Sequence, residues 1–233
     1  MALADVAGVD WAGGEWVVVR FHEGSYHGCA VVADFQTLWQ RHQDLDRILI
    51  DVPIGLPDEN SLGQREALDS LARTVTGFPS SVFPVPSREA AALAHEGESY
   101  GTVTQQNERD INKGLTKQSY QLAIATGQVD AVLGKETGAT EKVIESHPEV
   151  CFRGLLGRQL QHTKSTAPGV GERLQALEVH LQQPGAILQQ VAADLIGETC
   201  SVDIDDVLDA LALAVVAQSG AEIQYLPSDY RRD

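Results

Sequence analysis

Acidic residues stand where three short apolar segments of the chain end. Asp10 ends the first segment, Asp51 ends the second, and Glu145 stands near the end of the third. An isolated carboxylate is costly to bury, so an acid at the end of a buried strand indicates a role beyond packing. Two more acids, Asp206 and Asp209, are three residues apart in the run DDVLDALALAV. That spacing places both on one face of a predicted helix.

Carboxylates that converge repel one another and shift each other's pKa. A hard divalent cation relieves this repulsion, and ligands that are all oxygen favour Mg²⁺ or Mn²⁺. Two such ions can activate a water and stabilise the leaving oxygen in phosphodiester cleavage. We therefore predict a carboxylate-held metal centre whose ligands, which are also the catalytic residues, are Asp10, Asp51, Glu145, Asp206 and Asp209.

Most of these acids also have an architectural interpretation. Asp10 can cap the turn WAGG, and Asp51 can hydrogen-bond the loop PIGL that follows it. Asp205 and Asp206 can be cap residues at the start of the last helix, where acids are favoured by the helix dipole. Of these two, Asp205 is expected to be the cap rather than a ligand. Asp209 is harder to explain in this way, because it interrupts the apolar stretch of its own helix.

The elements that must position these acids follow from the apolar pattern. Strands are predicted at 6–10, 15–21, 26–32, 47–51 and 142–146. Helices are predicted at 35–43, 62–73, 88–95, 117–133, 148–156, 171–182, 185–196 and 204–218. Periodicity alone indicates an α/β sandwich. The order of the elements matches the ribonuclease H-like fold, a five-stranded mixed sheet flanked by helices. Residues 52–140 are then a largely helical insertion within a single domain, 1–233.

Composition limits the classes of protein that the chain can represent. Its 233 residues carry a net charge of −16 and are 43% hydrophobic, which suits a folded core and argues against non-specific coating of DNA. Residues 60–173 hold 12 of the 17 basic side chains, so the middle of the chain supplies most cations. The three scattered cysteines argue against a disulfide framework and a zinc site. The start of the chain lacks the pattern of a secretory signal, so we expect a cytoplasmic protein.

Six strings carry a resemblance to a known family: GVDWAGGEW, IDVPIGLPD, SSVFPVPSR, GLTKQ, ESHPEVCF and DDVLDALALA. In this order they resemble the family catalogued as domain of unknown function 429, described as predicted nucleases with a ribonuclease H-like fold. The chain is more distantly similar to RuvC-type Holliday junction resolvases. That resemblance implies catalytic acids at Asp10, Asp51, Asp206 and Asp209, whereas Glu145 is implied by the motif ESHPE of the closer family.

Further residues lie in or beside these motifs. Arg88, Lys117 and Lys164 could bind substrate by steadying phosphate oxygens near the metal centre, or they could be ordinary surface cations. Gln118 could hydrogen-bond a base or sugar, or it could simply be solvated. His147 could act as a general acid or be a buried, hydrogen-bonded histidine. The stretch LGQREALDS departs from the denser basic stretch of the family and offers only Arg65, which weakens a phosphate-binding role for that helix.

The function expected from these residues is metal-dependent nuclease activity on a structured or short nucleic acid, without a membrane partner. A non-catalytic binding or scaffold protein with the same fold is the alternative, and the overall acidity favours it. An actin-like phosphotransferase is a third interpretation, although it needs a second duplicated domain. The sequence leaves the oligomeric state open, and a homodimer is one candidate because resolvase-like folds often pair.

Overall fold

The computed structural model describes residues 4–58, 60–196 and 202–219. These residues form two compact units. The first unit contains the described residues between 1 and 51 and between 138 and 223, and the second contains those between 52 and 137. The second unit thus coincides with the predicted insertion, except that residues 138–140 belong to the first unit.

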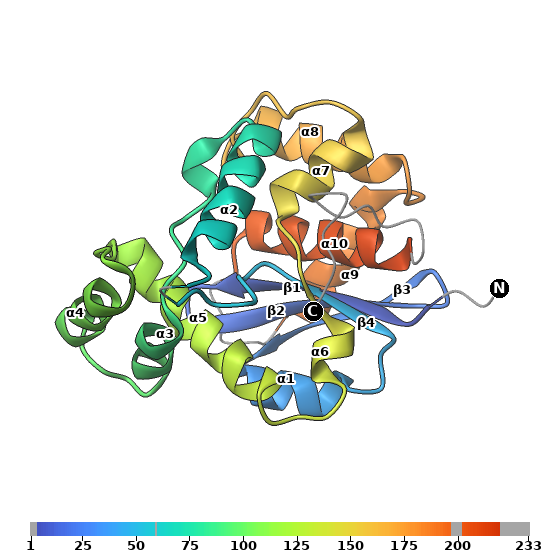
Figure 1. Cartoon of the computed structure of the whole chain (residues 1–233). Helices are drawn as coiled ribbons and strands as arrows, with labels where there is room; N and C mark the ends of the chain where they lie inside the picture. The colour runs from blue at the N-terminus through green and yellow to red at the C-terminus, as the bar shows by residue number, and fades with distance from the viewer. Residues whose placement is uncertain (1–3, 59, 197–201, 220–233) are drawn as a thin grey trace. The chain divides into compact units, whose positions relative to one another are not determined.

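A five-stranded sheet forms the centre of the first unit (Figure 1). Its strands are β1 (Val6–Ala12), β2 (Glu15–His22), β3 (Ser25–Val32), β4 (Arg47–Ile50) and β5 (Val143–Glu145), in the spatial order β3-β2-β1-β4-β5. The pairs β1–β2 and β2–β3 are antiparallel, whereas β1–β4 and β4–β5 are parallel. All five predicted strands are present, within two residues at each end. The α/β class and the mixed sheet are therefore confirmed.

Helices cover both faces of this sheet. They are α1 (Phe35–His42), α6 (Ala139–Lys142), α7 (Pro148–Leu156), α8 (Ala167–Glu178), α9 (Pro184–Asp194) and α10 (Ile204–Gln218). Helix α10 packs against β1, β2 and β4, and α7 packs against α10 and α8. Figure 1 shows α7, α8 and α10 on one side of the sheet and α1 on the other. Asp34 caps α1 as its residue type predicts, because its side chain accepts the Thr37 N–H at 2.8 Å.

Helix α8 begins four residues before its predicted start. The side chain of Thr166 accepts the backbone N–H of Gly169, and a proline occupies the first turn. Both features are typical of a helix N-terminus, because they satisfy or remove N–H groups that have no partner within the helix. The prediction from 171 followed the apolar residues and missed these polar signals.

Gly8 allows α10 to lie directly on the sheet. A Cβ at this position would stand 2.0 Å from the carbonyl oxygen of Ala210 and 2.2 Å from the nitrogen of Ala214. The backbones of β1 and α10 therefore approach more closely than any other residue would permit. This contact also fixes which face of β1 meets the helix, since Gly8 and Asp10 lie on the same face of the strand.

The second unit is helical. It contains α2 (Leu62–Thr76), a 3₁₀ turn η1 (Pro79–Ser81), α3 (Arg88–His95), α4 (Tyr100–Ile111) and α5 (Lys117–Leu133). The sequence did not predict α4, because its apolar residues are sparse, although Ser99 caps it. Part of the core consists of Ala90, Ala94, Val103, Leu115 and Ala123. The small side chains let α3 and α5 pack closely.

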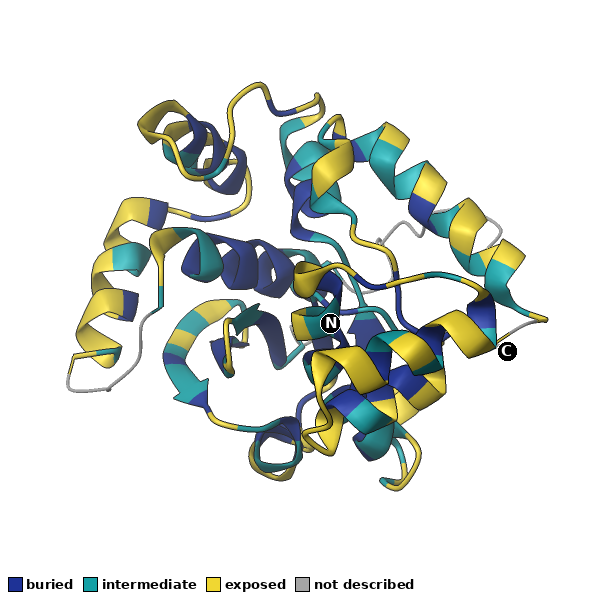
Figure 2. Ribbon diagram, turned by 90° about the vertical axis from the view of Figure 1, so that its left-hand side faces the viewer, coloured by how far each residue is buried: buried dark blue, intermediate teal, exposed yellow. Residues whose placement is uncertain are grey.

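Burial follows the expected pattern across the described residues. Buried side chains gather on the strands and the inner sides of helices, and exposed ones lie on the outer sides (Figure 2). Cys29 and Cys151 are both buried free cysteines, and Cys200 lies outside the described residues. No helix in the described part of the chain combines the length and the hydropathy that crossing a membrane requires.

Candidate functional site

Asp10 and Asp51 occupy neighbouring positions at the same edge of the sheet. The parallel strands pair Val9 with Ile50, and the N–H of Asp51 donates to the carbonyl of Val9 at 3.1 Å. Asp51 directly follows β4, as predicted, whereas Asp10 lies within β1, which continues to Ala12. Residues at matching positions of parallel strands project from the same face. The side chains of Asp10 and Asp51 therefore both project from the face of the sheet that α10 covers.

Helix α10 brings Asp209 to the same face. Gly8 fixes the helix against β1, and Asp209 lies one residue before Ala210, which contacts Gly8. Asp209 is 2% exposed and Asp10 is 6% exposed. We call Asp10, Asp51 and Asp209 the carboxylate centre. All three belong to the first unit and were predicted from the sequence.

The three carboxyl groups act on one another electrostatically. The pKa of Asp10 lies well above its usual value, because the side chain is buried and because Asp209 and Asp51 place negative charge beside it. Burial also raises the pKa of Asp51. Burial, with the charge of Asp51 adding to it, raises the pKa of Asp209 to about 7. The fold thus places three ionisable acids where their charged forms are costly, which is a recurrent property of functional sites.

Lys164 supplies the positive charge that these acids meet in the structure. Its Nζ donates to Oδ2 of Asp209 at 2.7 Å and lies 3.3 Å from Oδ2 of Asp205. Burial lowers the pKa of Lys164, but the charge of Asp209 and this hydrogen bond outweigh burial, so the pKa is raised. The lysine that was predicted to bind substrate is therefore paired with the carboxylate centre.

The contacts of Asp205 and Asp206 differ from those predicted, and the role of Asp206 as a metal ligand stays a prediction. Asp206 acts in capping, because its Oδ2 accepts the backbone N–H of the N-cap residue Asp203 at 3.0 Å. Asp205 instead shares Lys164 with Asp209, one helical turn further on. The prediction that Asp205 is the cap is wrong. The carboxyl of Asp206 still contributes negative charge to the pKa shift of Asp10.

Glu145 does not project from the same face of the sheet as the carboxylate centre. It pairs in register with Ile50, the residue before Asp51. Side chains alternate between faces along a strand, so Glu145 projects from the face opposite to Asp10 and Asp51. It adds to the raised pKa of Asp51 through its charge, but the register does not support its prediction as a ligand beside the other acids.

His147 follows the end of β5 and caps helix α7. Its Nδ1 accepts the backbone N–H of Glu149 at 3.2 Å, and its charge lowers the pKa of Asp51. The strand ends at Glu145, so His147 does not continue the face of that strand. Its cap contact agrees with the hydrogen-bonded interpretation, and its use as a general acid stays a prediction.

Sequence reasoning missed a fourth acid, Glu149, in the first turn of α7. It is 7% exposed and forms an ion pair with Arg173, which is fully buried and lies 5.4 Å from the ring of Phe152. The charge of Glu149 raises the pKa of both Asp51 and Asp209. The motif ESHPEVCF contains this residue, but no periodic signal distinguished it from an ordinary acid at a helix start.

Two buried carboxylate oxygens in this region have no hydrogen-bond partner among the described residues. They are Oδ1 of Asp209 and Oε2 of Glu149. An unpaired buried polar atom costs free energy, and an oxygen of this kind is available to a cation. As the side chains stand, however, no three His, Cys, Asp or Glu residues within 4–58, 60–196 and 202–219 converge closely enough to bind one metal ion.

The other predicted substrate residues lie in the second unit. Arg88 forms an ion pair with Asp130. Lys117 and Gln118 are exposed in the first turn of α5. These three residues belong to a different unit from the carboxylate centre, and their binding roles stay predictions.

The sheet and the carboxylate centre define an α/β protein with buried acids at the carboxyl ends of parallel strands. The chain belongs to a family described as Protein of unknown function (DUF429), whose family model matches residues 8–231. This membership confirms the family resemblance found in the sequence. No curated protein and no solved structure matches the chain.

Proposed function

We propose that this protein is a metal-dependent nuclease with a ribonuclease H-like fold. The strand order β3-β2-β1-β4-β5, with two antiparallel and two parallel pairings, supports the fold. The carboxylate centre supports the activity. The observation that carries the proposal is that Asp10, Asp51 and Asp209, from three separate segments, come together on the face that α10 covers.

The donor set fits a hard divalent cation such as Mg²⁺ or Mn²⁺. It consists of carboxylate oxygens, and Oδ1 of Asp209 is buried without a hydrogen-bond partner among the described residues. Because no three acids among the described residues converge on one point as their side chains stand, Asp10, Asp51 and Asp209 would hold the ion only after their side chains turn toward it. When bound, such an ion supplies positive charge that stabilises the charge developing on a phosphodiester oxygen.

The chain's own residues prepare the site in two ways. Burial keeps water away from Asp10 and Asp209, which strengthens every electrostatic interaction within the centre. Lys164 holds Asp209 in place through its 2.7 Å hydrogen bond and keeps a half-exposed ammonium beside the acids. A phosphate oxygen that reached this lysine would find a positive partner.

Replacing Asp10 by Asn tests the proposal directly. Wild-type protein is expected to cleave a short single strand or a branched duplex in Mn²⁺, and D10N is expected to lose at least a hundredfold in rate. The exposed acid Asp44 provides a matched control, because D44N removes the same charge outside the centre. Equal activity of D10N and wild type would reject the assigned ligands.

A non-catalytic binding or scaffold protein is the second candidate. The observation in its favour is that Lys164 already neutralises part of the centre, with Nζ between Asp205 and Asp209. Titration calorimetry with Mn²⁺ separates the two candidates. Heat of binding that D10N abolishes supports the nuclease, whereas no binding at millimolar Mn²⁺ supports the scaffold.

A further inference from the structure

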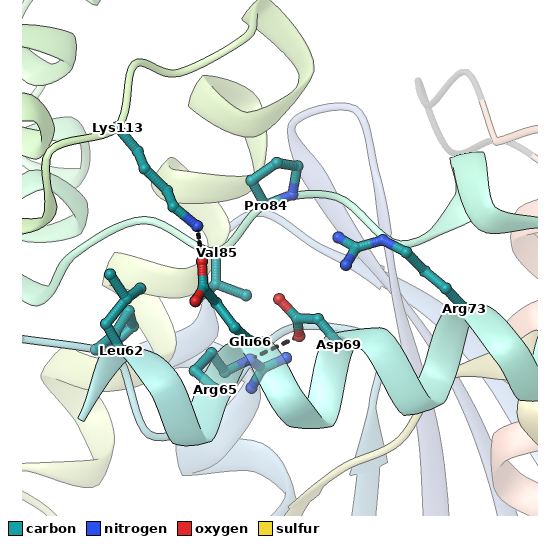
Figure 3. A pocket seen from close by; sticks show the side chains of 9 residues that line it. Leu62, Arg65, Glu66, Asp69, Arg73, Pro84, Val85 and Lys113 are labelled. Carbon is teal, nitrogen blue, oxygen red and sulfur yellow. Dashed lines mark hydrogen bonds and ion pairs between the residues drawn. The ribbon is translucent and has the colours of Figure 1, made fainter.

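The second unit contains a small cavity beside helix α2 (Figure 3). Its volume is about 160 Å³. Five lining residues come from α2, and the others come from residues 57, 84, 85 and 113. The lining is Pro57, Leu62, Arg65, Glu66, Asp69, Arg73, Pro84, Val85 and Lys113. Two of the lining residues that the loops contribute are prolines, whose rings fix their backbone φ angles.

Two of the three cations in the lining are paired with acids. Arg65 donates from Nε to Asp69 at 2.9 Å, and both side chains are at least nine-tenths buried. Lys113 forms an ion pair with Glu66 on the more exposed side. Figure 3 marks both interactions with dashed lines. These four charges therefore balance one another.

Arg73 is the third cation, and it has no ion pair among the described residues. Its Nη2 donates to the carbonyl of Val82 at 3.0 Å. A guanidinium carries five N–H donors, so most of those of Arg73 have no partner within the described part of the chain. Figure 3 shows the guanidinium of Arg73 pointing toward Asp69 and Pro84. The lining thus has one uncompensated positive charge with a planar set of donors.

Size and charge together select the occupant. The volume of about 160 Å³ is well below the volume of about 300 Å³ or more that drug-sized ligands need. A single oxyanion fits this space, with the rest of its molecule outside. Arginine can bind phosphate in a bidentate manner, through two parallel N–H···O hydrogen bonds, which lysine cannot do.

We propose that this cavity, the Arg73 cavity, binds one phosphate group of a phosphate ester. The ester is either a free nucleotide or a nucleic-acid strand, which present the same group. The stretch LGQREALDS offered only Arg65, but Arg73 lies beyond it in the same helix and contacts the phosphate oxygens. The Arg65–Asp69 pair lines the wall of the cavity against which the phosphate rests. The Arg73 cavity lies wholly in the second unit, so the proposal goes beyond the nuclease function and does not depend on cleavage.

Binding measurements on the full-length protein in EDTA test this site. The probes are inorganic phosphate and a nucleoside 5′-monophosphate by calorimetry, and a labelled ten-nucleotide single strand by fluorescence anisotropy. Replacing Arg73 by Gln is expected to weaken binding about tenfold or more, since hydrogen bonds to charged groups are strong. For the strand, the slope of log K against log salt is expected to fall by about 0.7. Binding of the small probes identifies a nucleotide site, and binding of the strand alone identifies a strand subsite.

Arg109 supplies the matched control in the same unit. It is exposed and does not line the Arg73 cavity, so R109Q removes one positive charge elsewhere on the unit. R73K retains the positive charge but loses the paired N–H donors of the guanidinium, so its affinity is expected to lie between those of R73Q and the wild type. Thermal unfolding by circular dichroism checks that each variant folds. Binding of none of the three probes, or equal losses in R73Q and R109Q, would overturn the proposal.

Discussion

Replacing Asp10 by Asn removes one negative charge from the carboxylate centre and preserves the size of the side chain. Asp10 and Asp51 follow paired residues on neighbouring parallel strands, which lie about 4.8 Å apart. Two charges about 5 Å apart repel by about 3 kcal/mol at an effective dielectric constant of 20. Lys164 offsets part of this repulsion, and the amide must itself be desolvated. We expect D10N to stabilise the metal-free protein by about 1–2 kcal/mol at pH 8.

The pH dependence gives this prediction a sign that can be checked. The pKa of Asp10 is raised above its ordinary value of 3.8 in the folded protein. The charged form is therefore costly at high pH, and this cost disappears as the pH falls through the raised pKa toward 3.8. The stabilising effect of D10N should be largest at pH 8 and should vanish near pH 4.

Urea unfolding in EDTA, followed by tryptophan fluorescence, provides the measurement. The three tryptophans, at positions 11, 16 and 39, all belong to the first unit, so the signal reports the unit that contains Asp10. D44N is expected to change the free energy of unfolding by less than about 0.5 kcal/mol. If D10N destabilises the protein by 1 kcal/mol or more at pH 8, the reasoning about mutual repulsion is wrong. Adding Mn²⁺ should stabilise wild type and leave D10N unchanged.

Three further substitutions are read by the same unfolding assay. Gly8→Ala places a Cβ 2.0 Å from a backbone oxygen of α10 and is expected to cost about 2–3 kcal/mol, whereas Gly154→Ala, in open space, should cost nothing. His42 has a pKa lowered to about 4 by burial, so stability should fall as the pH drops from 6.5 to 4. In the His42→Leu variant, the fall in the free energy of unfolding between pH 6.5 and pH 4 should be smaller by up to about 3 kcal/mol. The same pH profile in the variant and the wild type would contradict this account. Arg173→Met leaves the charge of Glu149 buried and unpaired, at a cost of about 3–5 kcal/mol. Adding Glu149→Gln should recover part of it, and no recovery would mean that the loss comes from packing.

The strands were predictable because their signal is local. A run of β-branched and apolar residues bounded by glycine turns, such as EWVVVRF, specifies β2 whatever surrounds it. Helix α4 was not predictable in this way. Few residues of α4 are apolar, so its formation depends on the cap at Ser99 and on packing within the second unit.

The acids show the same division. Asp10, Asp51 and Asp209 were recognisable because each interrupts or ends an apolar run where a charge is unexpected. Their neighbours were not recognisable from type and spacing. Asp205 and Asp206 are adjacent in the chain, and only their contacts in the folded protein tell them apart. Asp206 accepts a hydrogen bond that caps the helix, whereas Asp205 forms an ion pair with Lys164.

The sequence by itself determined the α/β class, the five strands and the three acids of the carboxylate centre, because these depend on the apolar pattern and its interruptions. The tertiary structure alone decided which acids share a face. The strand register places Glu145 on the face of the sheet opposite to the one from which Asp51 projects. The close contact at Gly8 packs α10 against the face that carries Asp10. It also brought Lys164, Glu149 and Arg173 to the region. Register and close packing arise from contacts between distant segments, and no local pattern encodes those contacts.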